Sequence, residues 1–338
     1  MKAAFIKEFG KNFVIEEAPT PVPGPAEVLV RVKASALCPG DLKIRAGRMP
    51  HLKLPRIPGH EVAGVVESVG LGVTSCNPGD RVVVYMYELC KSCPACRSGR
   101  ENLCADLVRM GFETQGGHAE FVIVKEDQIV FLPDSISFKD AAAIPDAIST
   151  SLHAIRDRAK VKLADTVIIY GVGGLGMHGV QIARLAGCRV IAVARSQDKL
   201  DKAREFGATD TVNAREQDVL QEVMRLTGNR GVDSVIDYVV NQESFTISAN
   251  ALKKGGVYAL VGSTDLSLTI PVGQMMFKEI AVKGSLGMTK QCVIDAVDLI
   301  DRGLIHPYVT EEYCLDDLNK AAERLGNSQV LGRSVILF

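Results

Sequence analysis

The sequence has no tryptophan, few aromatic residues and almost no net charge. Aromatic side chains make up 5% of the 338 residues, and 39 basic residues are set against 40 acidic ones. Such an even balance gives no general attraction to nucleic acid or to an anionic membrane surface. No apolar run reaches membrane-spanning length, and residues 1–10 lack the apolar core of a secretion signal. We therefore expect a cytoplasmic protein without nucleic-acid or membrane partners.

Apolar residues, in contrast, are plentiful, and they form 47% of the chain. A length of 338 residues exceeds what one hydrophobic core usually organises, so two domains are expected. Nine cysteines in a chain without a secretion signal favour metal binding or free thiols over a disulfide framework.

The first part of the chain has the pattern of short strands separated by turns. Residues 28–32, 61–69 and 81–85 are rich in valine, and Asn77-Pro-Gly-Asp80 is a turn sequence. Short strands at this spacing predict a compact, barrel-like β domain. From about residue 138 to 155 the period changes to that of a helix, which indicates a passage between two domains.

A cluster of four cysteines interrupts the β pattern. Cys90, Cys93 and Cys96 follow one another at a spacing of three, and Cys104 comes eight residues later. Four thiolates at this spacing can close a tetrahedral zinc site with no position for substrate, so the site would be structural. The alternative is four free thiols or a redox pair.

A second group of ligand types lies upstream. Cys38 and the sequence Gly59-His60-Glu61 offer a thiolate, an imidazole and a carboxylate. These are the ligand types of an open, catalytic zinc site, although a lone cysteine or histidine is more often an ordinary packing residue. The histidine of Gly117-His118-Ala119 is interpreted as such a packing residue.

From residue 166 onward strands alternate with helices. The apolar run 167–170 leads into a glycine-rich turn, a helix follows over 175–186, and a second strand follows over 190–194. In a dinucleotide-binding unit the first glycine allows the tight turn, the second lets the pyrophosphate approach, and the third lets the helix pack on the strand. The predicted cofactor-binding residues of the turn are Gly171, Gly173, Gly174, Leu175 and Gly176.

The end of the second strand predicts the type of cofactor. An acidic residue there would bind the adenosine 2′-hydroxyl of NAD, but the chain has Arg195 and Ser196, with Lys199 close behind. A guanidinium and a hydroxyl suit a 2′-phosphate, so NADP is preferred. Alternatively, Arg195 stacks on adenine and the site accepts NAD.

Taken together, the Gly-His-Glu sequence, the four-cysteine cluster and the glycine turn resemble those of the zinc-dependent medium-chain alcohol dehydrogenases over nearly the whole chain. The resemblance implies an α/β protein with a GroES-like β-barrel catalytic domain at residues 1–148, including a structural zinc lobe at about 88–106. It further implies a doubly wound Rossmann coenzyme domain at 149–287 and a return segment at 288–338. Two zinc ions per chain and assembly into a homodimer or homotetramer are also implied.

The same resemblance assigns further site residues. Cys38 and His60 match two ligands of the catalytic zinc, Asp146 matches the third, and Glu61 is an exchangeable fourth. Asp146 could instead be a helix-capping or solvated acid. The resemblance also places Thr150 at the nicotinamide carboxamide and Arg333 near the pyrophosphate.

The implied activity is zinc-assisted hydride transfer between NAD(P)(H) and a small alcohol, aldehyde or ketone. One departure from the family stands out, because Gly40 replaces the hydroxyl of the usual proton relay and Lys43 replaces its histidine. Asp41, between them, is expected to be buried. Without the relay, a second hypothesis is reduction of an activated carbon–carbon double bond in an enal or enoyl thioester. A third is a non-catalytic binding protein that retains the fold.

Overall fold

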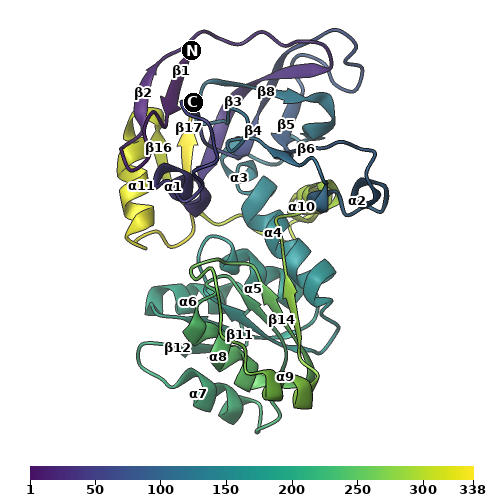
Figure 1. Cartoon of the computed structure of the whole chain (residues 1–338), viewed down its shortest axis with the longest axis vertical. Coiled ribbons are helices and arrows are strands. Elements are labelled where there is room, and N and C mark those ends of the chain that lie inside the picture. Colours follow the sequence, from purple (N-terminus) through teal and green to yellow (C-terminus); the bar gives the residue numbers. More distant parts are fainter. The chain divides into compact units, whose positions relative to one another are not determined.

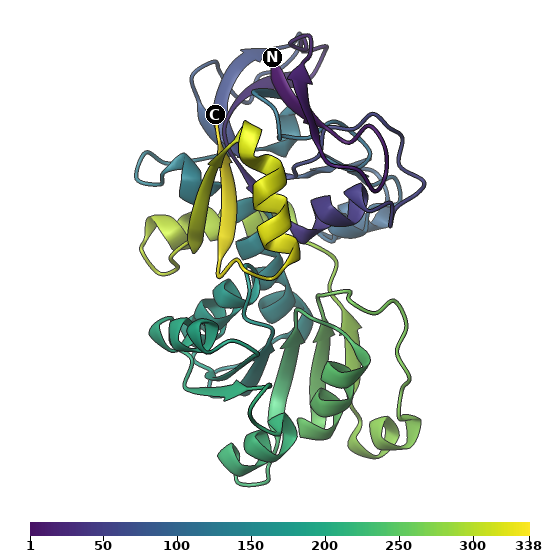
Figure 2. The same ribbon diagram turned by 90° about the vertical axis from the view of Figure 1, so that its left-hand side faces the viewer.

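The computed structural model describes residues 1–338 and separates into two compact units (Figures 1 and 2). Unit 1 contains Met1–Ser149 and Met288–Phe338, and unit 2 contains Thr150–Gly287. The last 51 residues, yellow-green to yellow in Figure 1, therefore belong to the same unit as the N-terminal half. None of the helices combines the length and the apolarity that crossing a membrane requires.

A seven-stranded sheet forms the centre of unit 1, and its hydrogen-bonded order is β16-β17-β3-β4-β5-β9, with β8 also pairing β3. The expected strands at 28–32, 61–69 and 81–85 are confirmed, and the first extends five residues further. Most valines of these strands are buried in one core cluster. The strands are β3 (Glu27–Leu37), β4 (Glu61–Val69), β5 (Arg81–Val84), β8 (Phe121–Lys125), β9 (Ile129–Phe131), β16 (Val309–Cys314) and β17 (Arg333–Leu337).

The register of this sheet brings three distant segments together. Ala36 of β3 pairs with Glu61 of β4, and Leu37 pairs with Ser334 of β17. The residues that follow β3, precede β4 and begin β17 are therefore neighbours at one end of the sheet.

Smaller elements surround the sheet of unit 1. Two further two-stranded sheets pair β1 with β2 and β6 with β7. These strands are β1 (Lys2–Phe5), β2 (Val14–Glu17), β6 (Tyr87–Glu88) and β7 (Val108–Arg109). The helices are α1 (Pro39–Arg45), α2 (Pro94–Arg97), α3 (Phe138–Ala141), α10 (Lys290–Asp301) and α11 (Leu318–Gly326), with 3₁₀ turns η1 (Glu101–Leu103), η2 (Glu126–Gln128) and η5 (Leu315–Asp317).

The helical period expected at residues 138–155 is confirmed, but the helix is irregular. After α3 come a π-helical turn, η3 (Ile144–Ile148), the short helix α4 (Ser149–Leu152) and a second π-helical segment, η4 (His153–Ala159). Wide π-helical turns are rare and frequently occur at functional sites. Asp146 lies in the first of them.

Unit 2 is a six-stranded parallel sheet of order β12-β11-β10-β13-β14-β15. This doubly wound order confirms the expected Rossmann arrangement, whose switch point lies between β10 and β13. The strands are β10 (Thr166–Tyr170), β11 (Arg189–Ala194), β12 (Asp210–Asn213), β13 (Val232–Asp237), β14 (Leu252–Leu260) and β15 (Ala281–Gly284). The helices are α5 (Gly176–Leu185), α6 (Gln197–Glu205), α7 (Val219–Leu226), α8 (Gln242–Ala251) and α9 (Val272–Lys278).

Candidate functional site

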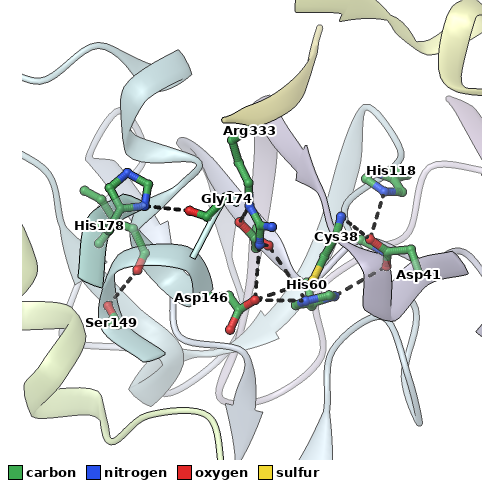
Figure 3. A network of polar contacts seen from close by, with 12 residues as sticks. Cys38, Asp41, His60, His118, Asp146, Ser149, Gly174, His178 and Arg333 are labelled. Carbon is green, nitrogen blue, oxygen red and sulfur yellow. Dashed lines mark hydrogen bonds and ion pairs between the residues drawn. The ribbon is translucent and has the colours of Figure 1, made fainter. Parts of the chain in front are cut away.

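A thiol, an imidazole and two carboxylates converge in the interior of unit 1. Cys38 Sγ lies 3.5 Å from Asp146 Oδ2, and His60 Nε2 lies 3.8 Å from the same oxygen (Figure 3). Cys38, His60, Glu61 and Asp146 each offer a ligand atom, and these atoms all lie within 4.8 Å of one another. The structure thus brings together the four residues that the sequence predicted as ligands of a catalytic metal.

The charge balance of this cluster favours a bound cation. Asp41 and Glu61 are fully buried and the Asp146 side chain is 13% exposed, whereas Arg333 is the one buried guanidinium that contacts Glu61 and Asp146. Even if His60 carries a proton, the carboxylates outnumber the cations. Burial raises the pKa of Glu61 to about 7, since Arg333 offsets this cost only in part. Buried carboxylates without enough counter-charge are costly, so a divalent cation fits the donor set.

Asp41 contacts the residues that carry the cluster, and it is buried as expected. It accepts hydrogen bonds from the backbone N–H groups of Cys38 and Gly59, both at 3.0 Å. Its Oδ1 also lies 3.4 Å from His60 Nδ1. Burial alone would raise the pKa of Asp41, but His60 and His118 hold it well below its usual range. A carboxylate on Nδ1 orients the ring so that Nε2 faces the cluster.

His118 extends this support, and its contact with Asp41 was missed at the level of sequence. It is fully buried, as a packing histidine should be, and its Nδ1 lies 3.0 Å from Ser35 Oγ. Its Nε2 lies 3.6 Å from Asp41 Oδ2. Gly59 has φ +96°, and the backbone of His118 packs closely against it. A Cβ on residue 59 would lie only 2.7 Å from the backbone nitrogen of His118. The Gly-His-Glu sequence therefore needs its glycine to admit His118.

Arg333 has partners that the sequence did not reveal. Its Nη2 contacts Glu61 Oε1 and lies 3.2 Å from Asp146 Oδ2, while its Nε donates to Glu61 Oε2 at 3.1 Å. Arg333 is 2% exposed. Within unit 1 Arg333 contacts these two carboxylates, and its expected place near the cofactor pyrophosphate stays a prediction.

Gly40 faces the cluster from α1, and an aromatic ring lies beside it. A Cβ added at Gly40 would lie 3.3 Å from His60 Cε1 and 3.4 Å from Phe112 Cζ. The Phe112 ring is tilted against the His60 ring at a centroid distance of 5.1 Å, and the Arg109 guanidinium lies 4.4 Å over its centroid. The place of the missing hydroxyl is thus bordered by an apolar ring. Lys43, one helical turn on, is half-buried, and burial lowers its pKa.

The four-cysteine cluster is also brought together. Cys90 Sγ lies 3.4 Å from Cys104 Sγ and 3.9 Å from Cys96 Sγ, and none of the four thiols is in a disulfide. Tetrahedral zinc–thiolate coordination separates sulfur atoms by about 3.8 Å. The N–H of Cys93, at 3.3 Å, the N–H of Ser92 and the Cys104 thiol together lower the pKa of Cys90 to about 6. The geometry of the lobe fits a closed all-thiolate site.

In unit 2 three glycines of the turn, Gly171, Gly173 and Gly176, have environments that suit a dinucleotide site. Gly171 has φ +89°, which favours glycine in the tight turn. A Cβ at Gly176 would lie 2.1 Å from Gly171 O, so the start of α5 packs directly on the end of β10. A Cβ at Gly173 would meet nothing within 4 Å, which leaves open space at the turn for a ligand. Gly174 and Leu175 lead into the helix.

The remaining predicted cofactor residues are distributed as follows. Arg195 is exposed directly after β11, and Ser196 is the N-cap of α6 but makes no side-chain capping bond. Burial lowers the pKa of Lys199, and the charge of Arg195 adds to this effect. Thr150 is buried in α4. The residue that follows β11 is thus an arginine and not a carboxylate.

A β unit with a buried thiol, imidazole and carboxylate cluster, joined to a parallel sheet with a dinucleotide turn, is the arrangement of metal-dependent, nicotinamide-linked dehydrogenases. Comparison with known proteins agrees. The alcohol dehydrogenase GroES-like domain family matches residues 24–134, and the zinc-binding dehydrogenase family matches residues 174–302. An alcohol dehydrogenase of Geobacillus stearothermophilus is 35% identical over 99% of both chains.

A solved structure of an NAD-dependent alcohol dehydrogenase is 33% identical and covers both chains fully, with a TM-score of 0.95. An acryloyl-coenzyme A reductase of Metallosphaera sedula is 29% identical over 99% of both chains. The chain therefore belongs to the zinc-dependent medium-chain alcohol dehydrogenase family, and the fold and family expected from the sequence are confirmed.

Proposed function

We propose that this dehydrogenase transfers hydride between a nicotinamide cofactor and a small alcohol, aldehyde or ketone, with zinc bound by Cys38, His60 and Asp146. The observation that carries the proposal is the buried convergence of these three ligand types beside an excess of negative charge. Zinc in this place supplies a Lewis acid for the substrate oxygen.

The surrounding residues have supporting roles. Asp41 fixes the tautomer and orientation of His60 through its contact with Nδ1. Arg333 holds both oxygens of Glu61, so Glu61 approaches a metal only when this ion pair loosens. Glu61 is therefore an exchangeable fourth ligand that leaves the position open to substrate.

We assign a second, structural zinc to Cys90, Cys93, Cys96 and Cys104. The sulfur separations support four-thiolate coordination, and the lobe contains little apolar material of its own. Zinc content of two per purified chain is the expected result, and it is measured by plasma mass spectrometry.

The cofactor proposed is NADP, with NAD as the alternative. Arg195 follows β11 directly, Lys199 lies in the first turn of α6, and the chain has no carboxylate at residue 195, where an acidic residue would bind the 2′-hydroxyl of NAD. The hydroxyl of Ser196 is not used for capping and is a further donor for a 2′-phosphate. The NAD-dependent relative supports the alternative.

A second candidate reaction is reduction of an activated carbon–carbon double bond. Hydride then adds to carbon, and no alcohol proton has to travel through a relay. Gly40 offers no hydroxyl, and the Phe112 ring borders its position. The acryloyl-coenzyme A reductase among the relatives supports this reading.

Purified protein with NADPH, offered a saturated aldehyde and the matching enal, tests both candidates. Formation of the saturated alcohol from the aldehyde supports the leading proposal. Loss of only the double bond of the enal contradicts it and supports the second. If the protein contains zinc but oxidises no cofactor with any carbonyl tested, a non-catalytic binding role becomes the better description.

The oligomer proposed is a homodimer or homotetramer formed through unit 2. The edge strand β15 has no further partner in the sheet, and its Val282 is 38% exposed. Val272, Met276 and Phe277 of α9, which precedes β15 in the chain, are 64% to 77% exposed. An open sheet edge and exposed apolar side chains are both typical of a protein interface. Phe277→Glu should lower the mass measured by light scattering to that of a smaller species.

A further inference from the structure

The glycine turn of unit 2 is held by two side chains that no motif includes. His178, fully buried in α5, has Nδ1 2.8 Å from the carbonyl oxygen of Gly174. Ser151, fully buried in α4, donates from Oγ to the carbonyl oxygen of Leu175 at 3.0 Å. Figure 3 shows the His178 ring turned toward Gly174. Two successive carbonyl groups of the turn are thus engaged by side chains.

The first contact defines the tautomer of the histidine. A carbonyl oxygen only accepts hydrogen bonds, so Nδ1 of His178 must carry a hydrogen. The carbonyl oxygen of Leu175 accepts from two donors, Ser151 Oγ and the N–H of Gly179 at 3.0 Å. Both contacts lie within unit 2.

These contacts set the direction of the neighbouring N–H groups. In a planar trans peptide the C=O and N–H point in opposite directions. A fixed Gly174 carbonyl therefore fixes the N–H of Leu175, and a fixed Leu175 carbonyl fixes the N–H of Gly176. The first N–H groups of a helix have no intrahelical partner, and they bind anions when they point the same way.

We propose that His178 and Ser151 are positioning residues for the cofactor pyrophosphate: they hold the carbonyls of Gly174 and Leu175 so that the N–H groups of Leu175 and Gly176 face the open space beside Gly173. This inference rests on the proposed use of a nicotinamide dinucleotide. It assigns the two residues no role in hydride transfer.

Binding of ADP-ribose and of adenosine to the intact protein, each measured by calorimetry or ligand-detected NMR, tests the proposal. ADP-ribose carries the pyrophosphate and adenosine does not. His178→Leu and Ser151→Ala each remove one hydrogen-bond donor, so each should weaken the binding of ADP-ribose by roughly 5- to 10-fold. Adenosine binding should change by less than about twofold.

Conservative variants separate the hydrogen bond from packing. His178→Asn places an N–H donor where Nδ1 stood, and Ser151→Thr keeps the hydroxyl, so both should recover most of the ADP-ribose affinity. Val180→Ala is the matched control, because Val180 is equally buried in α5 but contacts the turn through no polar group. This variant should lower the melting temperature of the protein without selectively weakening the binding of ADP-ribose.

Equal weakening of adenosine and ADP-ribose would overturn the proposal, and so would identical affinities for His178→Asn and His178→Leu. If His178→Leu does not fold, Ser151→Ala with Ser151→Thr decides the question. The measurement involves no turnover. If the variants lose ADP-ribose binding selectively but the protein reduces no carbonyl, the proposed function is refuted and this inference stands. If the enzyme is active but the variants show no selective loss, the proposed function stands and this inference is refuted.

Discussion

Arg333 and Glu61, which are 272 residues apart in the chain, form a buried ion pair beside the candidate metal ligands. The pair exists because β17 and β4 both flank the end of β3, where Leu37 pairs with Ser334 and Ala36 pairs with Glu61. Arg333 also reaches Asp146, so one guanidinium compensates two carboxylates.

Replacement of Arg333 by Leu should destabilise the protein by about 3–5 kcal/mol, because it leaves buried carboxylates without a partner. The double variant Arg333→Leu, Glu61→Leu should recover part of this loss. Chemical denaturation measures both. The surface pair Arg302–Asp298 is the control, since Arg302→Leu should cost about 0–1 kcal/mol. Equal losses for the two arginine variants would contradict the role of Arg333.

Cys93→Ser should disrupt the four-cysteine lobe, because a structural zinc contributes directly to folding. The expected outcome is loss of one zinc per chain and rapid proteolysis within residues 88–106. Cys314→Ser, at an exposed thiol outside both clusters, should leave zinc content and proteolysis unchanged. A stable Cys93→Ser protein with full zinc content would refute the structural assignment.

Arg195→Ala should weaken NADPH binding by roughly 10- to 100-fold and NADH binding by less than about threefold, because a charge-assisted bond to the 2′-phosphate is lost. Cofactor fluorescence titration gives both constants. Lys254→Ala removes another exposed cation of the same unit and should affect neither. Equal loss for both cofactors would instead support stacking of Arg195 on adenine.

Restoring a hydroxyl at residue 40 should require a smaller neighbour at residue 112. Gly40→Ser alone is expected to cost about 1–3 kcal/mol, since its Cβ would press on His60 and Phe112. Phe112→Leu in the same chain should relieve part of this cost.

If the missing relay limits alcohol chemistry, Gly40→Ser with Phe112→Leu should raise kcat for alcohol oxidation by at least about tenfold over Phe112→Leu alone. Gly40→Ala with Phe112→Leu is the control, because it adds the carbon but no hydroxyl. The same rate in the serine and alanine variants would show that no proton passes through this position.

Motifs whose partners lie close in sequence were predictable. The convergence of the four cysteines and the strand–turn–helix form of the glycine turn were predictable, because both arise within about fifteen residues. The strands at 28–32, 61–69, 81–85, 167–170 and 190–194 followed from apolar patterns, and the helical stretch at 138–155 followed from its period. The π-helical form of the turn that carries Asp146 was not predicted, since periodicity does not distinguish it from an α-helix.

The sequence by itself therefore determined the family, the fold and the candidate ligands, because local spacing and strand and helix periods encode them. Only the tertiary structure decided that Arg333 binds Glu61 and Asp146, that His118 contacts Asp41, and that Phe112 covers Gly40. These contacts join residues that are distant in sequence. They depend on the register of β3 with β4 and β17 and on side-chain packing, for which a single sequence carries no local signal.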